Sequence, residues 1–585
     1  MFSKYFMPLR QQLRKIDWLA RLYRKYFMKL PLDGGYSEIQ TAQNSLLSAI
    51  NIVRYQTCFS IIVPTYQPEL RLFKEMVASV IGQRYRHWQL VIVDDASQDA
   101  ALTDYLDSLV DDTRINVIQR FDNGHISKAS NDGLAAAIGD YIVLLDHDDL
   151  LHCDALSAMA EAIHNNPQAK VFYSDEDKIT EKGERVLPHF KPQWNRDLLY
   201  SMNYVSHLGV YQRELVESVG GFRVGFEGSQ DYDLLLRCLA KCNDQQIVHV
   251  PYVLYHWRAI QGSTALAESE KSYSAQAGLK ALQDALAGQV TSVEFGKLAN
   301  TYKVNWPIPD PQPLVSIIIP TKNAKKLVKQ CINSIYKKTL YPHFEILLVD
   351  NQSDELDSVD YFNVLEAEGK VRLISYDKPF NYSAINNYAV TQAKGDLLVL
   401  MNNDIEILSE PWLTEMVVNM SRPDIGCVGA KLYYPDGNLQ HAGVITGLGG
   451  VAGHSHKYFP KGHDGYFKRL KVTQNLSAVT AACLAVRKDV FEQVGGLNEQ
   501  HLTIAFNDVD LCLKVQQAGY RNLWSPYIEM VHHESISRGT EDTPEKQARF
   551  ASEVNYMKKT WGEPLLNDPC YSQWLTLDRE DFTLR

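Results

Sequence analysis

The stretch GDYIVLLDHDDLL, from Gly139 to Leu151, decides the fold class of this 585-residue chain. Its apolar run lies between Gly-Asp and a group of acids, which is typical of a short buried strand. Side chains alternate along a strand, so Asp146 and Asp148 leave its end on the same side. Paired carboxylates at the carboxyl end of an α/β strand suit a divalent cation that carries phosphate oxygens. Alternatively, Asp149 caps the following helix and the other acids are solvated.

Length and composition indicate a folded chain of two or more domains. The formal net charge of −11 argues against a general nucleic-acid binder. Nine cysteines show no paired-ligand spacing, and Cys238 and Cys242 lie in an apolar helical pattern that favours core packing over metal binding. These features indicate a reducing cytoplasm, and neither a signal peptide nor an apolar run of transmembrane length is visible.

The N-terminal segment, residues 1–50, differs from the rest of the chain. Apolar residues recur there at three- and four-residue steps, which predicts one apolar helical stripe: Phe2, Phe6, Leu9, Leu13, Ile16, Leu19, Tyr23, Phe27 and Leu30. Basic residues flank the stripe, and Asp17 is the single acid among the first thirty residues. We expect a basic amphipathic helix that lies on an anionic membrane surface. A helix docked on its own domain and a dimerising coiled coil are the alternatives.

Strand and helix patterns alternate from Phe59 onward. SIIVPTY (Ser60–Tyr66) and QLVIVDDAS (Gln89–Ser97) predict buried strands, with a helix near Arg71–Gly82 between them. Such alternation predicts a mostly parallel sheet, whose ligands lie beyond the carboxyl ends of its strands. Thr65, Asp95 and Asp148 all fall on that edge.

The same series of strands then returns. SIIIPTK (Ser316–Lys322), ILLVDNQS (Ile346–Ser353) and GDLLVLMNND (Gly395–Asp404) repeat the three strands in order. The following pairs are each 256 positions apart: Pro64 and Pro320, Asp94 and Asp350, Asn131 and Asn387, Gly139 and Gly395, Asp148 and Asp404. This constant offset indicates an internal duplication. We predict domains at residues 55–300 and 314–565, a stiff Pro-rich linker at 301–313 and a C-terminal tail at 566–585.

The second part of each copy repeats more loosely. A Gly-Gly segment precedes GSQDYDLLLRC in copy one and FNDVDLCLKV in copy two. Asp231 precedes His256 by 25 positions, and Asp508 precedes His533 by 25. Copy two also has an extra Gly- and His-rich stretch, Gly447–Gly465, which is either a lid over a substrate or an ordinary surface loop.

SIIVPTY, VDDAS, DHDD and the GGF and EGSQDYDL segments resemble the inverting glycosyltransferases of family 2, which have the Rossmann-like GT-A fold. The second copy, with VDNQS, NND and FNDVDLCL, resembles the rhamnosyltransferase-like members of that family. The resemblance covers residues 58–300 and 313–560 and implies two tandem GT-A domains after the N-terminal helix. Bacterial enzymes with this layout build O-antigen, capsule or related surface glycans.

The resemblance implies roles for residues in both copies. Asp231, at a helix start, and the matching Asp508 are the implied catalytic bases, with an N-cap acid as the alternative for Asp231. Mg²⁺ or Mn²⁺, one ion per domain, is the implied cofactor; its implied ligands are Asp148 and His256 in copy one, and Asp404 and His533 in copy two. A packed core histidine is the alternative for His256. The implied donor-binding residues are Pro64, Thr65, Asp95, Asn131 and Asp146 in copy one, and Pro320, Thr321, Asp350, Asn387 and Asn402 in copy two.

Copy two departs from copy one at two of these places. Asn351 stands where copy one has Asp95, and Asn402 where it has Asp146. The second change leaves Asp404 as the only carboxylate of its triplet and puts the strength of metal binding in doubt.

These features predict a bifunctional enzyme on the cytoplasmic face of the membrane. It would move sugars from UDP- or dTDP-sugar donors to a polyprenol-linked surface glycan at two separate sites. One active transferase fused to a non-catalytic acceptor-binding or assembly module is the main alternative. A nucleotide-sugar sensor without catalysis is disfavoured because both candidate bases are present.

Overall fold

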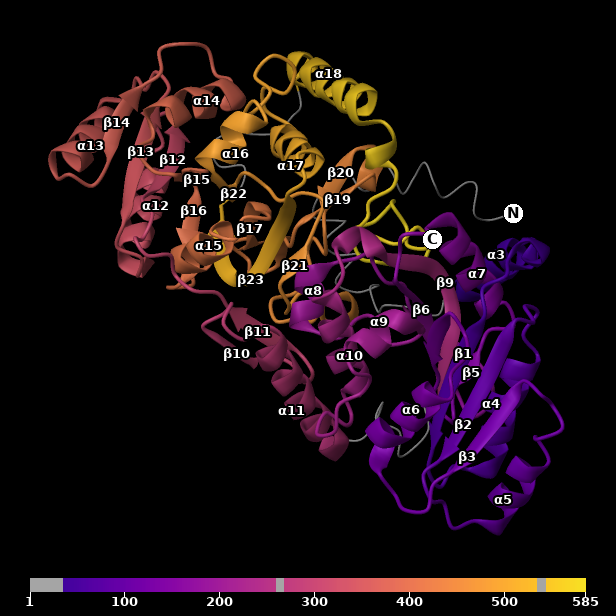
Figure 1. Cartoon of the computed structure of the whole chain (residues 1–585). Helices are drawn as coiled ribbons and strands as arrows, with labels where there is room; N and C mark the ends of the chain where they lie inside the picture. The colour runs from indigo at the N-terminus through magenta and orange to yellow at the C-terminus, as the bar shows by residue number, and fades with distance from the viewer. Residues whose placement is uncertain (1–34, 259–267, 534–542) are drawn as a thin grey trace.

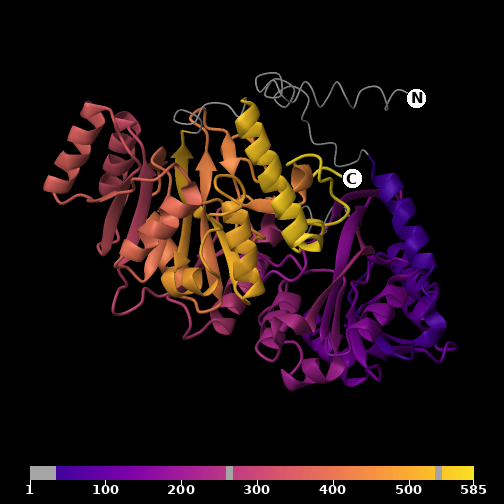
Figure 2. The ribbon, with the colours of Figure 1, turned by 90° about the horizontal axis from the view of Figure 1, so that it is seen from above.

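The computed structural model describes residues 35–258, 268–533 and 543–585, and side chains of 268–272 are outside that description. The predicted N-terminal amphipathic helix lies outside the described residues. The described chain forms two α/β halves that lie side by side, with its C-terminal end between them (Figures 1 and 2). No helix of the described ranges is long and apolar enough to cross a bilayer.

The first half is built on a sheet with strand order β3-β2-β1-β4-β8-β6-β9-β5. Its strands are β1 (Phe59–Thr65), β2 (Trp88–Asp94), β3 (Ile115–Gln119), β4 (Tyr141–Leu144), β5 (Leu150–Leu151), β6 (Val171–Ile179), β7 (Arg185–His189), β8 (Gly209–Gln212) and β9 (Ile247–Arg258). Its helices include α3 (Tyr36–Ser48), α4 (Leu70–Ile81), α5 (Ala100–Asp107), α6 (His125–Ala135), α7 (Ala155–Asn165), α8 (Arg196–Ser201), α9 (Arg213–Ser218), α10 (Gln230–Leu239) and α11 (Glu268–Ala285). The pairs of β1 with β2 and β4, and of β2 with β3, are parallel, whereas β8 is antiparallel to both neighbours.

The second half repeats this topology, with order β14-β13-β12-β15-β22-β17-β23-β16. Its strands are β12 (Val315–Thr321), β13 (Phe344–Asp350), β14 (Arg372–Ser375), β15 (Leu397–Met401), β16 (Ile405–Ile407), β17 (Ile425–Tyr433), β18 (Leu439–His441), β21 (Gln474–Asn475), β22 (Cys483–Arg487) and β23 (Arg521–His532). Its helices include α12 (Lys325–Lys338), α13 (Leu356–Ala367), α14 (Tyr382–Gln392), α15 (Trp412–Met420), α16 (Lys488–Gln493), α17 (Asn507–Gln517) and α18 (Pro544–Trp561). The predicted class, two tandem α/β units with parallel sheet centres, is confirmed.

Strand periodicity explains why both sheets are covered on two faces. In β1, Phe59, Ile61 and Val63 join one buried cluster, while Ile62 joins the cluster on the opposite face. Adjacent side chains of a strand point to opposite faces, so a continuous apolar run marks a strand buried on both sides. Burying each such side chain stabilises the fold by about 1.5–3 kcal/mol.

The two halves share a polar interface at α8 and β21. Asp197 accepts hydrogen bonds from Arg422 Nη1 at 2.6 Å and Asn475 Nδ2 at 2.8 Å, and also pairs with Arg521. Burial opposes ionisation of Asp197, but the two guanidinium groups lower its pKa below the usual range. Asn195 Nδ2 donates to the Asn475 carbonyl at 2.8 Å, so the contact is fixed by backbone as well as by charge.

Two predicted boundaries differ in the structure. The stretch predicted as linker begins with β11 (Tyr302–Asn305), which pairs with β10 (Ser292–Phe295) and so belongs to the first half. The predicted tail, 566–585, packs between the halves: Leu575 and Phe582 join a buried cluster with Tyr36 and Phe190. Local patterns did not show this, because the partners are hundreds of residues away.

Candidate functional site

The carboxyl edge of the first sheet brings together residues from three strands. β1 ends at Thr65 and pairs there with Asp94, the last residue of β2. Asp95 N donates to the Thr65 carbonyl at 2.8 Å, which joins the two strand ends. The acids that follow β4 lie beyond the same edge, since β4 is parallel to β1.

Asp95 fixes the loop before α6. Its Oδ1 accepts from Gly124 N at 2.8 Å and lies 2.8 Å from Arg120 Nε. In the second half the position of Arg120 is Tyr376, and Asn351 replaces Asp95. Asn351 Nδ2 donates to the Tyr376 carbonyl at 3.0 Å, so an amide now makes a neutral contact in place of the ion pair. Asp350 accepts from Ser353 N at 3.1 Å and closes the turn after its strand.

The three acids after β4 have different surroundings. Asp149 is buried and accepts from Tyr255 OH at 2.5 Å and Arg258 N at 2.7 Å, so it holds β9 against the loop rather than capping a helix. Asp146 Oδ2 lies 3.7 Å from His207 Nε2, and its burial raises its pKa. The Asp148 carbonyl accepts from Arg258 Nε at 2.5 Å. Asp146 and Asp148 therefore remain the candidates for an ion.

Asp231 is the second residue of α10, after Ser229 at the N-cap. The N-cap alternative for Asp231 is therefore not what the structure shows. Asn203 Nδ2 donates to Asp231 Oδ2 at 2.8 Å and holds the carboxylate in place. Asp146 and Asp231 line the same cavity, of about 590 Å³. This cavity can hold a sugar between the acidic edge and a carboxylate base.

Asn131 and Asn387 make the same contact in the two halves. Asn131 Nδ2 donates to the Phe222 carbonyl at 2.8 Å, and its Oδ1 accepts from Phe222 N at 2.8 Å. Asn387 makes the same pair of bonds with Leu497. The preceding Gly221 has φ +66, and a Cβ there would lie 2.5 Å from Asn131 Oδ1. These amides therefore fasten the segment after each Gly-Gly pair to the preceding helix, and their contact with a donor stays a prediction.

His256 lies in a buried network rather than beside the acidic edge. Its Nδ1 is 2.7 Å from Asp177 Oδ1, and Asp177 also accepts from Tyr36 OH at 2.5 Å and Arg185 Nε at 2.6 Å. Burial lowers the pKa of His256. Among the described residues no contact joins its ring to Asp148, and the packed-histidine alternative fits better than a metal ligand.

The second acidic edge is organised by His532, not by His533. His532 Nε2 lies 3.1 Å from Asp404 Oδ1 and 3.2 Å from Asn402 Nδ2. The ring of His533 instead contacts Glu406 Oε2 at 3.0 Å, and only its backbone N reaches the Asp404 carbonyl. The ring contact with Asp404 that was expected of His533 is thus made by His532, and a metal-ligand role for either ring stays a prediction.

Sheet register explains this difference. Leu150 pairs with His256, whereas Glu406, 256 positions after Leu150, pairs with Val531. The position of His532 in the first half is thus Trp257. Counting 25 residues from each base matched the wrong positions, because the halves differ in length between the base and this strand.

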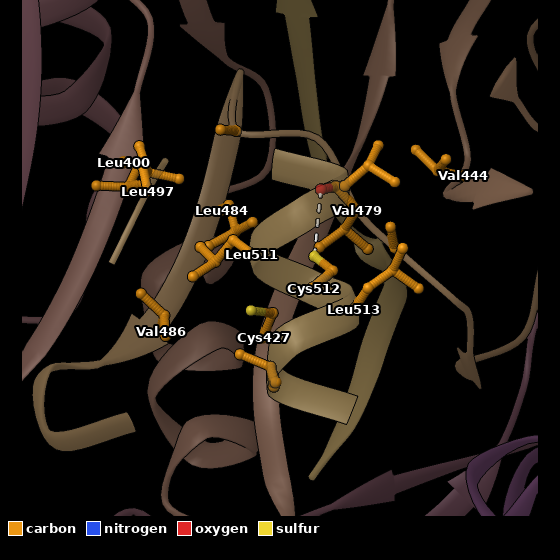
Figure 3. Close-up of a cluster of buried hydrophobic side chains, with 14 of the residues drawn as sticks. Leu400, Cys427, Val444, Val479, Leu484, Val486, Leu497, Leu511, Cys512 and Leu513 are labelled. Atoms are coloured by element: carbon orange, nitrogen blue, oxygen red, sulfur yellow. Dashed lines mark hydrogen bonds between the residues drawn. The ribbon is translucent and has the colours of Figure 1, made fainter. Parts of the chain in front are cut away.

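Asp508 is the second residue of α17, as Asp231 is of α10. Its Oδ2 accepts from Ala481 N at 3.0 Å, and burial raises its pKa although hydrogen bonds from Ala481 and Thr480 oppose the rise. The inner face of α17, with Leu511 and Cys512, packs in the core of this half (Figure 3). Cys512 Sγ donates to the Val479 carbonyl at 3.7 Å, which fixes the helix that carries Asp508.

The Glycosyl transferase family 2 model matches residues 60–220 and 316–495, one match in each half. The chain belongs to glycosyltransferase family 2. It carries one domain of this family in each half, which confirms the resemblance and the glycosyltransferase class expected from the sequence.

Relatives match both halves of this glycosyltransferase. The uncharacterized protein y4gI of Sinorhizobium fredii is 51% identical over 90% of this chain and 58% of its own length. The O-antigen biosynthesis protein RfbC of Myxococcus xanthus is 38% identical over 90% of this chain and 41% of its own length. The chain thus spans about half the length of these relatives. Among solved structures, Staphylococcus aureus TarS 1–349 in complex with UDP-GlcNAc aligns at 20% identity with a TM-score of 0.32, covering 40% of this chain and 67% of that chain.

Sequence reasoning missed two histidines at the sites of this glycosyltransferase. His532 stands in a visible His-His pair, so inspecting both members would have found it. His207 reaches Asp146 from the loop before β8 and stacks on Tyr255 with ring centroids 4.4 Å apart. No spacing rule signals His207, because only the folded sheet brings its loop to the acidic edge.

Proposed function

We propose that the chain is a bifunctional inverting glycosyltransferase with one transfer site in each half. The observation that carries the proposal is the repeated placement of a carboxylate at the second position of a helix, Asp231 in α10 and Asp508 in α17. If one site had lost its activity, its base would no longer be needed and a single candidate base would be expected. The repeated carboxylates therefore favour two active sites.

The chemistry needed at each site is one displacement at the anomeric carbon. The acceptor hydroxyl oxygen forms a bond to that carbon as the bond to the nucleoside diphosphate breaks. The hydroxyl proton passes to Asp231 or Asp508, and the diphosphate leaves with the electron pair of the broken bond. A positioned base contributes about 10²–10⁴ in rate. Pro64, Thr65 and Asp95 would hold the nucleoside at the first site, with Pro320, Thr321 and Asp350 at the second.

The residues at both edges fit a divalent cation, Mg²⁺ or Mn²⁺, one in each domain. Asp146 and Asp148 offer carboxylate oxygens at the first edge. Asp404 Oδ1 and His532 Nε2 stand 3.1 Å apart at the second, close to the separation of about 3 Å expected for neighbouring ligands of a small cation. A bound cation would neutralise charge on the departing diphosphate. His152, Cys153 and Asp154 also cluster, but Asn44 and Arg84 bind the ring of His152 and the carboxylate of Asp154.

One active transferase with a non-catalytic second domain is the second candidate. Asn402 and Asn403 favour it, since they leave Asp404 as the only carboxylate of the triplet. The His532 ring beside Asp404 weakens this objection for Mn²⁺, which takes an imidazole nitrogen more readily than the harder Mg²⁺ does.

The proposed donors are UDP- or dTDP-sugars, and the proposed acceptor is a polyprenol-linked glycan of the O-antigen or capsule type. The RfbC relative, named for O-antigen biosynthesis, supports the glycan class. The apolar N-terminal stripe and the basic residues that flank it support a peripheral place on the inner face of the cytoplasmic membrane. Removing residues 1–30 should then move the protein from the membrane fraction to the supernatant, and unchanged partitioning would count against the membrane contact.

The decisive experiment uses the intact chain with Asp231→Asn or Asp508→Asn. Each change keeps the size of the side chain but removes its basicity, so each should abolish one linkage and leave the other. Product analysis with a panel of nucleotide sugars and a synthetic polyprenol-diphosphate glycan reads out both linkages. If both variants lose the same linkage, the two-site proposal fails; if Asp508→Asn loses nothing, the second half is the non-catalytic module.

A further inference from the structure

A short segment of the second half forms part of the wall of the first-half cavity. The cavity that contains Asp146 and Asp231 is also lined by Phe467 and Lys468. These two residues follow the Gly- and His-rich stretch and belong to a 3₁₀ turn, η4 (Tyr466–Lys468). The first transfer site is therefore incomplete without the second half of the chain.

The turn is held firmly against the first half. Phe190 N donates to Tyr466 OH at 2.8 Å, and the Phe467 ring stacks on His189 with centroids 3.8 Å apart and planes 13° apart. Phe467 and Lys468 have φ values of 42° and 68°. Side-chain-bearing residues rarely adopt this left-handed conformation, and it persists where the surroundings fix it, often at binding sites.

Lys468 lies on the side of the cavity where the candidate base stands. Its Nζ donates to the Ala299 carbonyl at 2.8 Å. The next residue, Asn300, contacts Ser274 Oγ at 3.3 Å, and Ser229 Oγ donates to the Ser274 carbonyl at 2.8 Å. Ser229 is the N-cap of α10, two residues before the base. A chain of contacts thus links Lys468 to the start of the catalytic helix.

We propose that Phe467 and Lys468 form the acceptor-sugar subsite of the first transfer, so that the second half selects the acceptor used by the first. This inference rests on the proposed function of Asp231 as the base. The acceptor hydroxyl must meet that base, and the cavity there offers an aromatic face and an ammonium group. A sugar ring presents apolar C–H groups that pack on aromatic faces, and its hydroxyl oxygens accept hydrogen bonds from an ammonium group.

Aromatic side chains of the first half complete this subsite. Trp257 is partly exposed and lines the cavity, whereas Tyr232 is fully buried, with its OH donating to the Leu199 carbonyl at 2.5 Å, and supports the cavity wall without offering a free ring face. Trp257 occupies the register position that His532 has in the second half. The first half thus has an indole facing its cavity where the second has an imidazole beside Asp404, which suits sugar packing rather than ion binding.

The test uses the intact chain with Asp508→Asn, which silences the second site. Transfer from UDP- and dTDP-hexoses to a panel of p-nitrophenyl glycosides is measured together with hydrolysis of the same donors by water. For Phe467→Ala and Lys468→Met, we expect the acceptor KM to rise about tenfold, the range for losing one contact to a charged or aromatic group. Hydrolysis should fall far less than transfer, because water needs no acceptor subsite.

Matched variants separate this role from a structural one. Lys461→Ala removes an exposed lysine of the preceding Gly- and His-rich stretch, Gly447–Gly465. The Lys461 side chain packs over Tyr433, and its removal should leave both rates unchanged. Phe467→Tyr keeps the ring and should restore the acceptor KM. An unchanged acceptor KM in Phe467→Ala and Lys468→Met, or equal losses of transfer and hydrolysis, would overturn the inference. Absence of any activity that Asp231→Asn removes would instead overturn the proposed function itself.

Discussion

The two halves of the chain place different side chains at the same sheet edge. The first half has Asp146, Asp148 and Asp149 after β4, and the second has Asn402, Asn403 and Asp404 after β15. His532 stands beside Asp404, whereas the matching register position of the first half is Trp257. The change of Asp146 to Asn402 is thus accompanied by a new polar partner, His532, whose Nε2 lies 3.2 Å from Asn402 Nδ2, whereas Asp149 is replaced by the apolar Ile405.

Asp95 and Asn351 follow the same rule. The first half pairs a carboxylate with Arg120, and the second pairs an amide with the backbone carbonyl of Tyr376, the residue at the position of Arg120. A decaying copy would leave partners unmatched in the interior, which is costly for buried polar groups. The comparison indicates that the two sheet edges diverged while the amides of Asn351 and Asn402 kept hydrogen-bond partners, which agrees with the proposal of a second site.

Removing the single carboxylate of the second edge is the strongest challenge to this comparison. Asp404→Ala should lower the second transfer by about a hundredfold or more, because stabilisation of the leaving diphosphate is worth several kcal/mol. Added Mn²⁺ should not restore it. Asp148→Ala should lower the first transfer in a manner that added Mn²⁺ partly reverses, since Asp146 remains. Rates are measured for each linkage with the other base silenced, and an Asp404→Ala chain that keeps its second transfer would refute the cation site.

If the two halves fold as one unit, the buried carboxylate of Asp197 at their interface should contribute strongly to stability. Asp197→Ala leaves Arg422 and Arg521 without their buried carboxylate and should lower the free energy of unfolding by about 3–5 kcal/mol. Urea unfolding followed by tryptophan fluorescence measures the loss, and both transfers should weaken together. Asp424→Ala is the matched control: it contacts the same Arg521 but is half exposed, so about 1 kcal/mol or less is expected.

The same carboxylate gives a pH dependence. The pKa of Asp197 is lower in the folded chain than in the unfolded one, so the ion pair contributes its full stability above the ordinary carboxyl range, about pH 4. That contribution is lost as the pH falls through the lowered pKa. Acid unfolding of Asp197→Ala should therefore lack this component. Identical acid profiles of the parent and the variant would contradict the assignment.

Features that depend on neighbouring residues could be predicted from the sequence, whereas features that depend on contacts between distant segments could not. The strands and the helix start at Asp231 follow from local patterns, and the duplication follows from the constant offset; the structure shows all of them. The choice of His532 over His533 depends on sheet register, which spacing along the chain does not determine. The roles of Asn131 and of the C-terminal tail depend on partners far away in sequence, so no local pattern carries them.

The two histidines of the second edge, His532 and His533, allow a more specific test, with a smaller expected effect. His532→Ala should raise the half-saturating Mn²⁺ concentration of the second transfer by about 10–100-fold, the effect typical of losing a group that holds or orients a metal. His533→Ala should leave that concentration nearly unchanged, because its ring contacts Glu406 and Gln330. The first transfer serves as the internal control in both variants. A larger effect of His533→Ala than of His532→Ala would instead support His533 as the ligand, as its spacing of 25 residues from Asp508 suggested.

The smallest expected effect concerns the base of the second half. Burial raises the pKa of Asp508, and a hydrogen bond from Thr480 opposes that rise. Thr480→Val keeps the shape of the side chain but removes the donor, so the pKa of Asp508 should rise further. The base acts only when ionised, so the second transfer should lose activity at a higher pH as the solution is acidified, with little change at alkaline pH.

The measurement is the pH profile of kcat/KM for the second linkage in the Asp231→Asn chain, with the profile of the first linkage in Asp508→Asn as the reference. A rate that falls equally at every pH would mean that Thr480 positions the substrate rather than tuning the base.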